Sequence, residues 1–143
     1  MSEQVQTYSI INIILLQSNF ERDWIINLTH SEFTNHTDIK VTSQRSPEHL
    51  SVTVSLLYSA GIKGGKTEVK ADIKMVGIFT VPTESELPID VFTNVNAPAI
   101  IFPFLREHLA SISAKSGISP IMLQPINFVK NIEGKQDKMD TKL

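Results

Sequence analysis

The 143-residue sequence contains no cysteine. Disulfide bonds, thiolate metal sites and thiol catalysis are therefore all excluded, and the absence fits a reducing compartment. The sequence also has no basic excess, since 13 Lys and Arg stand against 15 Asp and Glu, giving a net charge of −2. Such a chain lacks the positive charge with which proteins hold nucleic acid or an anionic membrane surface. We expect neither partner.

Long hydrophobic runs are missing as well. The apolar stretch Ile10–Leu16 is interrupted by Asn12 and is too short to span a bilayer. It lacks the basic flank and the small-residue cleavage site of a signal peptide. We therefore expect a cytoplasmic protein that does not insert into a membrane.

The composition that remains is that of a folded, soluble domain. Hydrophobic residues make up 41% and charged residues 20% of the chain, a balance that separates it from disordered sequences. Its length suits one domain, which we place at residues 1–130. Residues 131–143 are polar with mixed charge, and we expect them to form a flexible tail.

Two segments in the first half alternate with the period of a β-strand. From Val69 to Val81 the apolar residues share one face and charged residues lie opposite, and Leu50–Tyr58 repeats this pattern. Alternation with one polar face predicts an antiparallel sheet with one side in water. The Gly- and Lys-rich stretch Ser59–Lys66 between them predicts a hairpin connection.

The remaining strands are less clearly marked. Tyr8–Gln17 is apolar on both faces, which predicts a strand covered on both sides. Trp24–Phe33 is a weaker strand candidate, and Asn35–Glu48 is predicted to be a polar loop. The count is four antiparallel strands.

The second half predicts one long helix. Asn96 is a good N-cap, and Pro98 falls in the first turn, where its missing N–H costs nothing. Pro103 lies inside the helix and should kink it, and Gly117 should end it. An apolar stripe of helical period follows the same stretch, formed by Ile101, Leu105, Leu109 and Ile112. Beyond the helix, Ile118–Ile126 contains two prolines and predicts an extended crossing segment.

These elements define an α+β fold, a four-stranded antiparallel sheet with a long kinked helix on one side. One helix cannot cover a whole sheet. The adjacent Leu15 and Leu16 make uncovered apolar surface expected on the first strand. Self-association with closed symmetry is the usual solution.

No motif supports catalysis, a metal or a cofactor. Residues 60–67 (Ala-Gly-Ile-Lys-Gly-Gly-Lys-Thr) resemble a phosphate-binding loop. A true loop of that kind precedes a helix, whereas a strand pattern follows here, so a hairpin is the better interpretation. The four histidines show no ligand spacing, and surface or hydrogen-bonded roles explain them better than a site gathered from separate loops. We expect no enzyme activity.

Three ordered motifs in the second half resemble the SecB family. They are a strand end at residues 76–79 (Val-Gly-Ile-Phe), the helix segment Asn96–Glu107 with Phe-Pro-Phe-Leu-Arg-Glu at its end, and residues 123–128 (Leu-Gln-Pro-Ile-Asn-Phe). The Phe20–Trp24 step is similar to the F-x-x-D-W step of that family. The resemblance covers Lys70–Phe128 most closely.

The resemblance implies a chaperone that works without ATP and holds unfolded preproteins or other non-native polypeptides for export. It implies a homotetramer built as a dimer of dimers, with the long helices at the centre. The helix stripe, Ile101, Leu105, Leu109 and Ile112, then fits either the monomer core or the central helix layer, and we expect it to serve both as core and as oligomer interface. Apolar grooves on the outside would take clients, with contacts from Phe20, Trp24, Ile118, Ile121 and Met122. For Trp24, core packing is an equal alternative.

The resemblance also places Asp72 where the family keeps an acidic residue that docks on the translocation motor SecA. An ordinary exposed strand charge explains Asp72 equally well. SecB proteins are usually strongly acidic, whereas this chain is nearly neutral. A dedicated chaperone for one partner, such as the antitoxin of a toxin–antitoxin pair, is therefore the alternative function.

Overall fold

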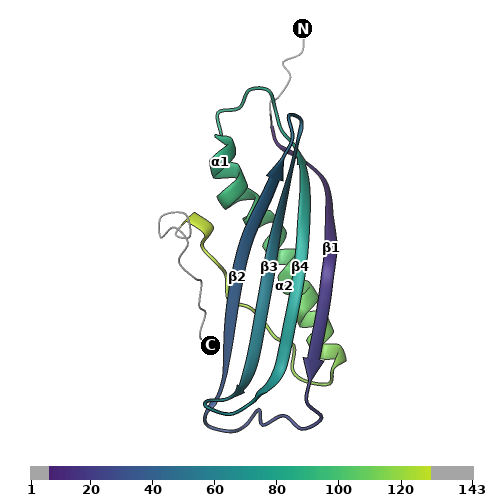
Figure 1. Cartoon of the computed structure of the whole chain (residues 1–143), viewed down its shortest axis with the longest axis vertical. Coiled ribbons are helices and arrows are strands. Elements are labelled where there is room, and N and C mark those ends of the chain that lie inside the picture. Colours follow the sequence, from purple (N-terminus) through teal and green to yellow (C-terminus); the bar gives the residue numbers. More distant parts are fainter. Residues whose placement is uncertain (1–6, 130–143) are drawn as a thin grey trace.

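The computed structural model describes residues 7–129, and the predicted tail at 131–143 lies outside them. Four strands form one antiparallel sheet in the order β1-β4-β3-β2. Their bounds are Ser9–Arg22 for β1, Phe33–Arg45 for β2, His49–Ile62 for β3 and Thr67–Thr80 for β4. The main helix lies across one face of this sheet (Figure 1). The predicted α+β class and the four antiparallel strands are confirmed.

The β3–β4 hairpin follows the sequence pattern closely. Along β4, Val69, Ile73 and Phe79 are at most 1% exposed and lie on the face beneath the helix. The strands extend to Ile62 and from Thr67, so that the turn takes only residues 63–66, with Gly64 at a φ of 80°. A positive φ favours glycine because it has no Cβ to clash. The stretch that resembles a phosphate-binding loop is therefore a hairpin, as predicted.

The second strand was predicted in the wrong place. Residues 24–32 form a loop, and the segment expected to be a loop is β2, Phe33–Arg45, paired with β3 along its whole length. On β2 the side chains of Thr37 and Ile39 are buried, whereas His36 and Lys40 on the other face are exposed to solvent. An edge strand with few apolar residues on its inner face gives a weak period-two signal, which explains the error.

The helix also begins earlier than predicted. Helix α1 spans Ile89–Val91, a π-helical turn η1 spans Phe92–Asn96, and α2 continues as Ala97–Lys115. Asn96 has helical backbone angles and its side chain caps nothing, so the predicted N-cap is wrong; Pro88 is the N-cap. In η1 the Ala97 N–H donates to the Phe92 carbonyl. This wider turn gives room to the ring of Pro98, which would otherwise crowd the preceding turn.

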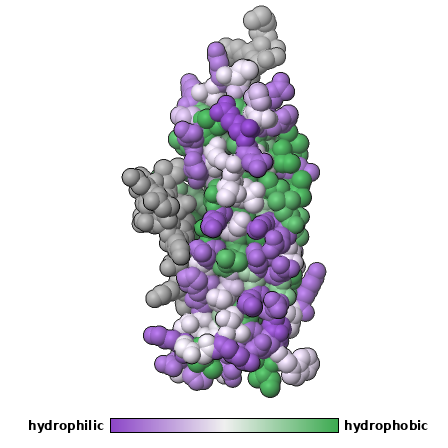
Figure 2. All heavy atoms as spheres, in the orientation of Figure 1, coloured by the Kyte–Doolittle hydropathy of each residue, from purple (hydrophilic) through white to green (hydrophobic). Residues whose placement is uncertain are grey.

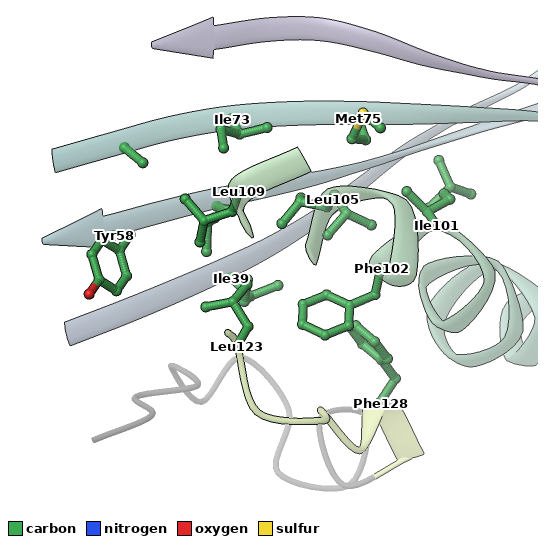
Figure 3. Close-up of a cluster of buried hydrophobic side chains, with 14 of the residues drawn as sticks. Ile39, Tyr58, Ile73, Met75, Ile101, Phe102, Leu105, Leu109, Leu123 and Phe128 are labelled. Carbon is green, nitrogen blue, oxygen red and sulfur yellow. The ribbon is translucent and has the colours of Figure 1, made fainter. Parts of the chain in front are cut away.

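Helix α2 packs its apolar stripe onto the centre of the sheet. Ile101, Leu105 and Leu109 are 0% exposed, and Figure 3 shows Leu105 and Leu109 pointing toward Ile73 of β4. Gly77 lets the helix approach closely, because a Cβ there would lie 2.8 Å from Cδ1 of Ile101. Pro103 lies within α2, on its exposed side; the kink predicted there stays a prediction.

The helix ends as predicted, and the chain then crosses back. Gly117 has a φ of 88° and donates its N–H to the Ala114 carbonyl at 3.0 Å. Residues 118–127 form neither helix nor strand, in agreement with the predicted crossing segment. Ser113 Oγ holds this segment to the helix by accepting the Ile121 N–H at 2.8 Å. The Phe102 and Phe128 rings meet edge to face at 6.0 Å (Figure 3).

Strand β1 was predicted to be covered on both sides, and this prediction is wrong. It is an edge strand with two register shifts against β4. Ile10, Ile11, Leu15 and Leu16 are 42–58% exposed, and Figure 2 shows hydrophobic residues gathered along the right-hand side, where β1 lies in Figure 1. The uncovered apolar surface expected at Leu15 and Leu16 is confirmed, and it also includes Ile10 and Ile11.

Candidate functional site

Among residues 7–129, the two most exposed large apolar side chains lie in the loop between β1 and β2, residues 23–32, which we call the tip loop. Trp24 is 93% exposed, Ile25 71% and Leu28 49%. Figure 1 places this loop at the lower end of the sheet, beside the β3–β4 hairpin. At 93% exposure Trp24 has no part in the core, so the alternative of core packing is excluded. Clustered apolar residues left in water on a surface loop indicate an interaction site.

The base of the tip loop is held to strand β4 by the buried Glu68, which is 4% exposed. Its Oε1 accepts the backbone N–H of Asn27 at 2.7 Å, and both carboxylate oxygens accept the Asn27 side-chain amide at 3.1 Å. The Asp23 N–H donates to the Glu68 carbonyl at 2.8 Å. Lys66 adds an ion pair with Asp23 at 3.0 Å. The loop thus exposes apolar side chains from a backbone that polar contacts hold in place, which reduces the ordering cost of binding.

The anchor at Glu68 should depend on pH. The backbone and side-chain hydrogen bonds from Asn27 lower the pKa of the Glu68 carboxyl below its ordinary value. Because the pKa is lower in the folded state, the stabilisation is fully present above the unfolded-state pKa and is lost as the pH falls through the folded-state pKa. We expect thermal stability to fall more steeply with acidification in the wild type than in Glu68→Gln. Parallel pH slopes of the two melting temperatures would contradict this.

The second predicted group of client contacts lies around the crossing segment, which we define as Ile118–Ile126. Met122 is 61% exposed and Ile118 is half-buried, but Ile121 is only 9% exposed and packs into the core. Phe20 is half-buried on the helix-covered face of β1, opposite Ala71. Of the five predicted contacts, Trp24 and Met122 therefore present the most surface, and Ile121 presents little.

Asp72 lies on the opposite, open face of the sheet, next to Asn19 of β1 and Leu57 of β3. A shallow hollow of about 550 Å³ surrounds it. Its lining includes Glu21, His36, Asp38, Leu57, Lys70 and Asp72. The lining is therefore locally acidic, with three carboxylates against one lysine, although the chain as a whole is nearly neutral. Leu57 at 53% exposure supplies an apolar centre.

The predicted interface stripe on the helix lies inside the single chain. Ile101, Leu105 and Leu109 have no exposed surface and Ile112 is partly buried against the core. They form the monomer core, and an apolar surface that a partner could reach on α2 is offered by Phe104 instead, which is 49% exposed. Sequence reasoning missed Phe104, Ile25 and Leu28. Phe104 adjoins Pro103 outside the buried stripe, which is the signal that points to it.

Among residues 7–129, no three His, Cys, Asp or Glu side chains gather as metal ligands. His108 contacts Ser18, with Nε2 2.8 Å from Oγ, and so joins α2 to β1. Within the same residues, no helix combines the length and the apolarity needed to cross a bilayer.

Comparisons with known proteins identify the family. The family described as "Preprotein translocase subunit SecB" matches residues 19–138. A "Protein-export protein SecB" from Methylobacillus flagellatus is 30% identical over 87 residues, which are 61% of this chain and 55% of that protein. Its counterpart from Magnetococcus marinus is 29% identical over 64% of this chain and 57% of its own length. These two matches thus span little more than half of each relative.

Two further matches extend over most of the chain. The "Protein-export protein SecB" of Neisseria meningitidis is 25% identical over 141 residues, or 96% of each protein. In structure, the chain resembles the SecB-like chaperone of Mycobacterium tuberculosis, solved in complex with a peptide from an antitoxin. The TM-score is 0.73 with 14% sequence identity, covering 84% of this chain and 91% of that one, and this likeness shows the fold. Because the family match covers well over half of its residues, the protein belongs to the SecB family.

Proposed function

We propose that the protein is a holdase that works without ATP in the cytoplasm and binds extended segments of non-native polypeptides for export. The observation that carries this proposal is the exposure of Trp24, Ile25 and Met122 on two non-repetitive segments of an otherwise well-packed fold. A non-native client exposes the side chains that its native form would bury. Apolar contacts with the tip loop and the crossing segment select for this property and need no sequence code.

The energetics suit reversible holding. Each methylene removed from water stabilises the complex by about 0.8 kcal/mol. Several weak contacts along one chain raise the overall affinity through effective concentration, without a deep pocket. Binding then competes with folding, so proteins that fold fast bury their apolar segments first and escape. No nucleotide is needed for such a cycle.

We further propose a homotetramer built as a dimer of dimers. The exposed apolar residues of β1 and Phe104 of α2 support self-association, because surfaces of this kind are usually covered in stable assemblies. In this proposal Leu105 and Leu109 do not form the contact between subunits, because their side chains are fully buried in the core of their own chain. The central helix layer would therefore be made by the outward side of α2.

Suppression of aggregation tests the function directly. Citrate synthase unfolded in guanidinium would be diluted into buffer that contains increasing amounts of the protein and no ATP, while light scattering is followed. We expect scattering to be suppressed at near-stoichiometric tetramer. Scattering that stays unchanged at a severalfold excess of tetramer would contradict holdase activity.

Two downstream roles are candidates for the protein: delivery of the client to SecA, and a dedicated role for one partner. Delivery to SecA is supported by the local acidity around Asp72, which suits a basic docking site. A dedicated role is supported by the near-neutral chain and by the solved structure of similar fold, whose partner is an antitoxin peptide. Measurable SecA binding that Asp72→Asn weakens would favour delivery. Binding to one antitoxin encoded beside the gene, without SecA affinity, would favour the dedicated role.

A further inference from the structure

Arg22, the last residue of β1, connects three segments through its guanidinium group. Nε donates to the Asp23 carbonyl at 2.9 Å, and Nη2 donates to the Trp24 carbonyl at 2.8 Å. Nη1 donates to the carbonyl of Ser116 at 2.7 Å. All three acceptors are main-chain oxygens. The side chain therefore joins the backbone of the tip loop to the backbone at Ser116, which lies 94 residues further along the sequence than Arg22.

The contact with Ser116 stabilises the point where the crossing segment begins. Ser116 is the C-cap of α2, and its carbonyl lies among the last carbonyls of the helix, which have no intrahelical donor. A cation is favoured there by the negative end of the helix dipole. Gly117 follows with its left-handed φ and turns the chain into the crossing segment. Arg22 therefore holds the first residues of that segment against the end of β1.

The hydrogen bond to the Trp24 carbonyl determines the position of the Trp24 side chain, the most exposed one of the tip loop. Since the Trp24 residue is 93% exposed, side-chain packing does not hold it, and its position follows from its backbone. A guanidinium is planar and rigid, so it also fixes the angle between the groups it joins. A lysine ammonium is a point charge on a flexible stem, and it cannot hold the same three carbonyls in one plane.

We propose that Arg22 is a positioning residue that sets Trp24 at a fixed place relative to the start of the crossing segment, so that both contact one client chain. This inference rests on the proposed holdase function. Without Arg22, the Glu68 contacts still hold the base of the loop, but the position of Trp24 relative to the crossing segment must be fixed when the client binds, and that ordering costs affinity. Arg22 itself need not touch the client.

Fluorescence tests the positioning step alone, because Trp24 is the sole tryptophan. Time-resolved anisotropy of the free protein would be compared among wild type, Arg22→Lys and Arg22→Ala. We expect both variants to show a larger fast, local depolarisation, with Arg22→Lys keeping the wild-type melting temperature within a few degrees. Arg45→Ala is the matched control, since Arg45 is exposed at the opposite end of the sheet. Unchanged local motion of Trp24 in Arg22→Lys would overturn the proposal.

Client affinity tests the consequence. Fluorescein-labelled carboxymethylated α-lactalbumin, which stays unfolded without denaturant, would be titrated with each variant. We expect Arg22→Lys to weaken binding about two- to tenfold, and to have no further effect in a Trp24→Ala background. Equal weakening in both backgrounds would overturn the proposal, because the effect would not act through Trp24. A wild-type protein that binds no client overturns the proposed function instead, while the anisotropy still decides whether Arg22 holds the loop.

Discussion

Trp24→Ala is expected to weaken client binding about 30-fold while leaving the stability of the fold unchanged. An indole side chain buries about 150–250 Å² when it is covered. Aromatic residues at the centre of a contact commonly contribute about 2 kcal/mol or more, which corresponds to this loss of affinity. Because the residue is 93% exposed in the free chain, its removal should change the free energy of unfolding by less than about 0.5 kcal/mol.

Leu57→Ala is the matched control for this prediction. Leu57 is an exposed apolar residue on the open face, away from the tip loop and the crossing segment. Affinity for carboxymethylated α-lactalbumin, measured by fluorescence anisotropy of the labelled client, should be unchanged in Leu57→Ala. Equal losses of client affinity in both variants would show that any exposed apolar residue can contact the client, with no special role for the tip loop. Wild-type affinity in Trp24→Ala would remove the tip loop from the client surface.

Leu105→Ala is expected to lower the free energy of unfolding by about 2–5 kcal/mol. Leu105 is 0% exposed between α2 and the sheet, so the truncation removes buried methyl groups and leaves a cavity. Since domains of this size are stable by about 5–15 kcal/mol, this loss is a large part of the total. Urea unfolding followed by circular dichroism, with its midpoint and slope, measures the change.

The neighbouring substitution Phe104→Ala distinguishes a role in the core from a role in subunit assembly. Phe104 is 49% exposed on the other side of α2, so its removal should leave the fold nearly as stable and weaken the proposed tetramer. Sedimentation at decreasing concentration would show the shift to smaller species. If Leu105→Ala instead left stability intact and dissociated the tetramer, the central stripe would be an interface after all.

Local sequence patterns predicted the hairpin and the helix end correctly. The alternation in Val69–Val81 reports directly which side chains are buried, because each strand residue points to the face opposite its neighbour's. Gly117 marks the helix end because left-handed backbone angles suit glycine best. The ordered motifs between Lys70 and Phe128 also sufficed to indicate the family before any fold was known.

Only the tertiary structure decided the position of β2, the exposure of Trp24 and the contact between Arg22 and Ser116. β2 is a strand because β3 supplies hydrogen bonds along its whole length, although its own residues read as a polar loop. Trp24 is exposed because no element covers it, and α2 ends above the tip loop (Figure 1). A tryptophan looks the same in the sequence whether it is in the core or on the surface. Arg22 meets Ser116 only because the helix runs back along the sheet to the end of β1. Burial and long-range contact depend on which face another element covers, and no local pattern contains that information.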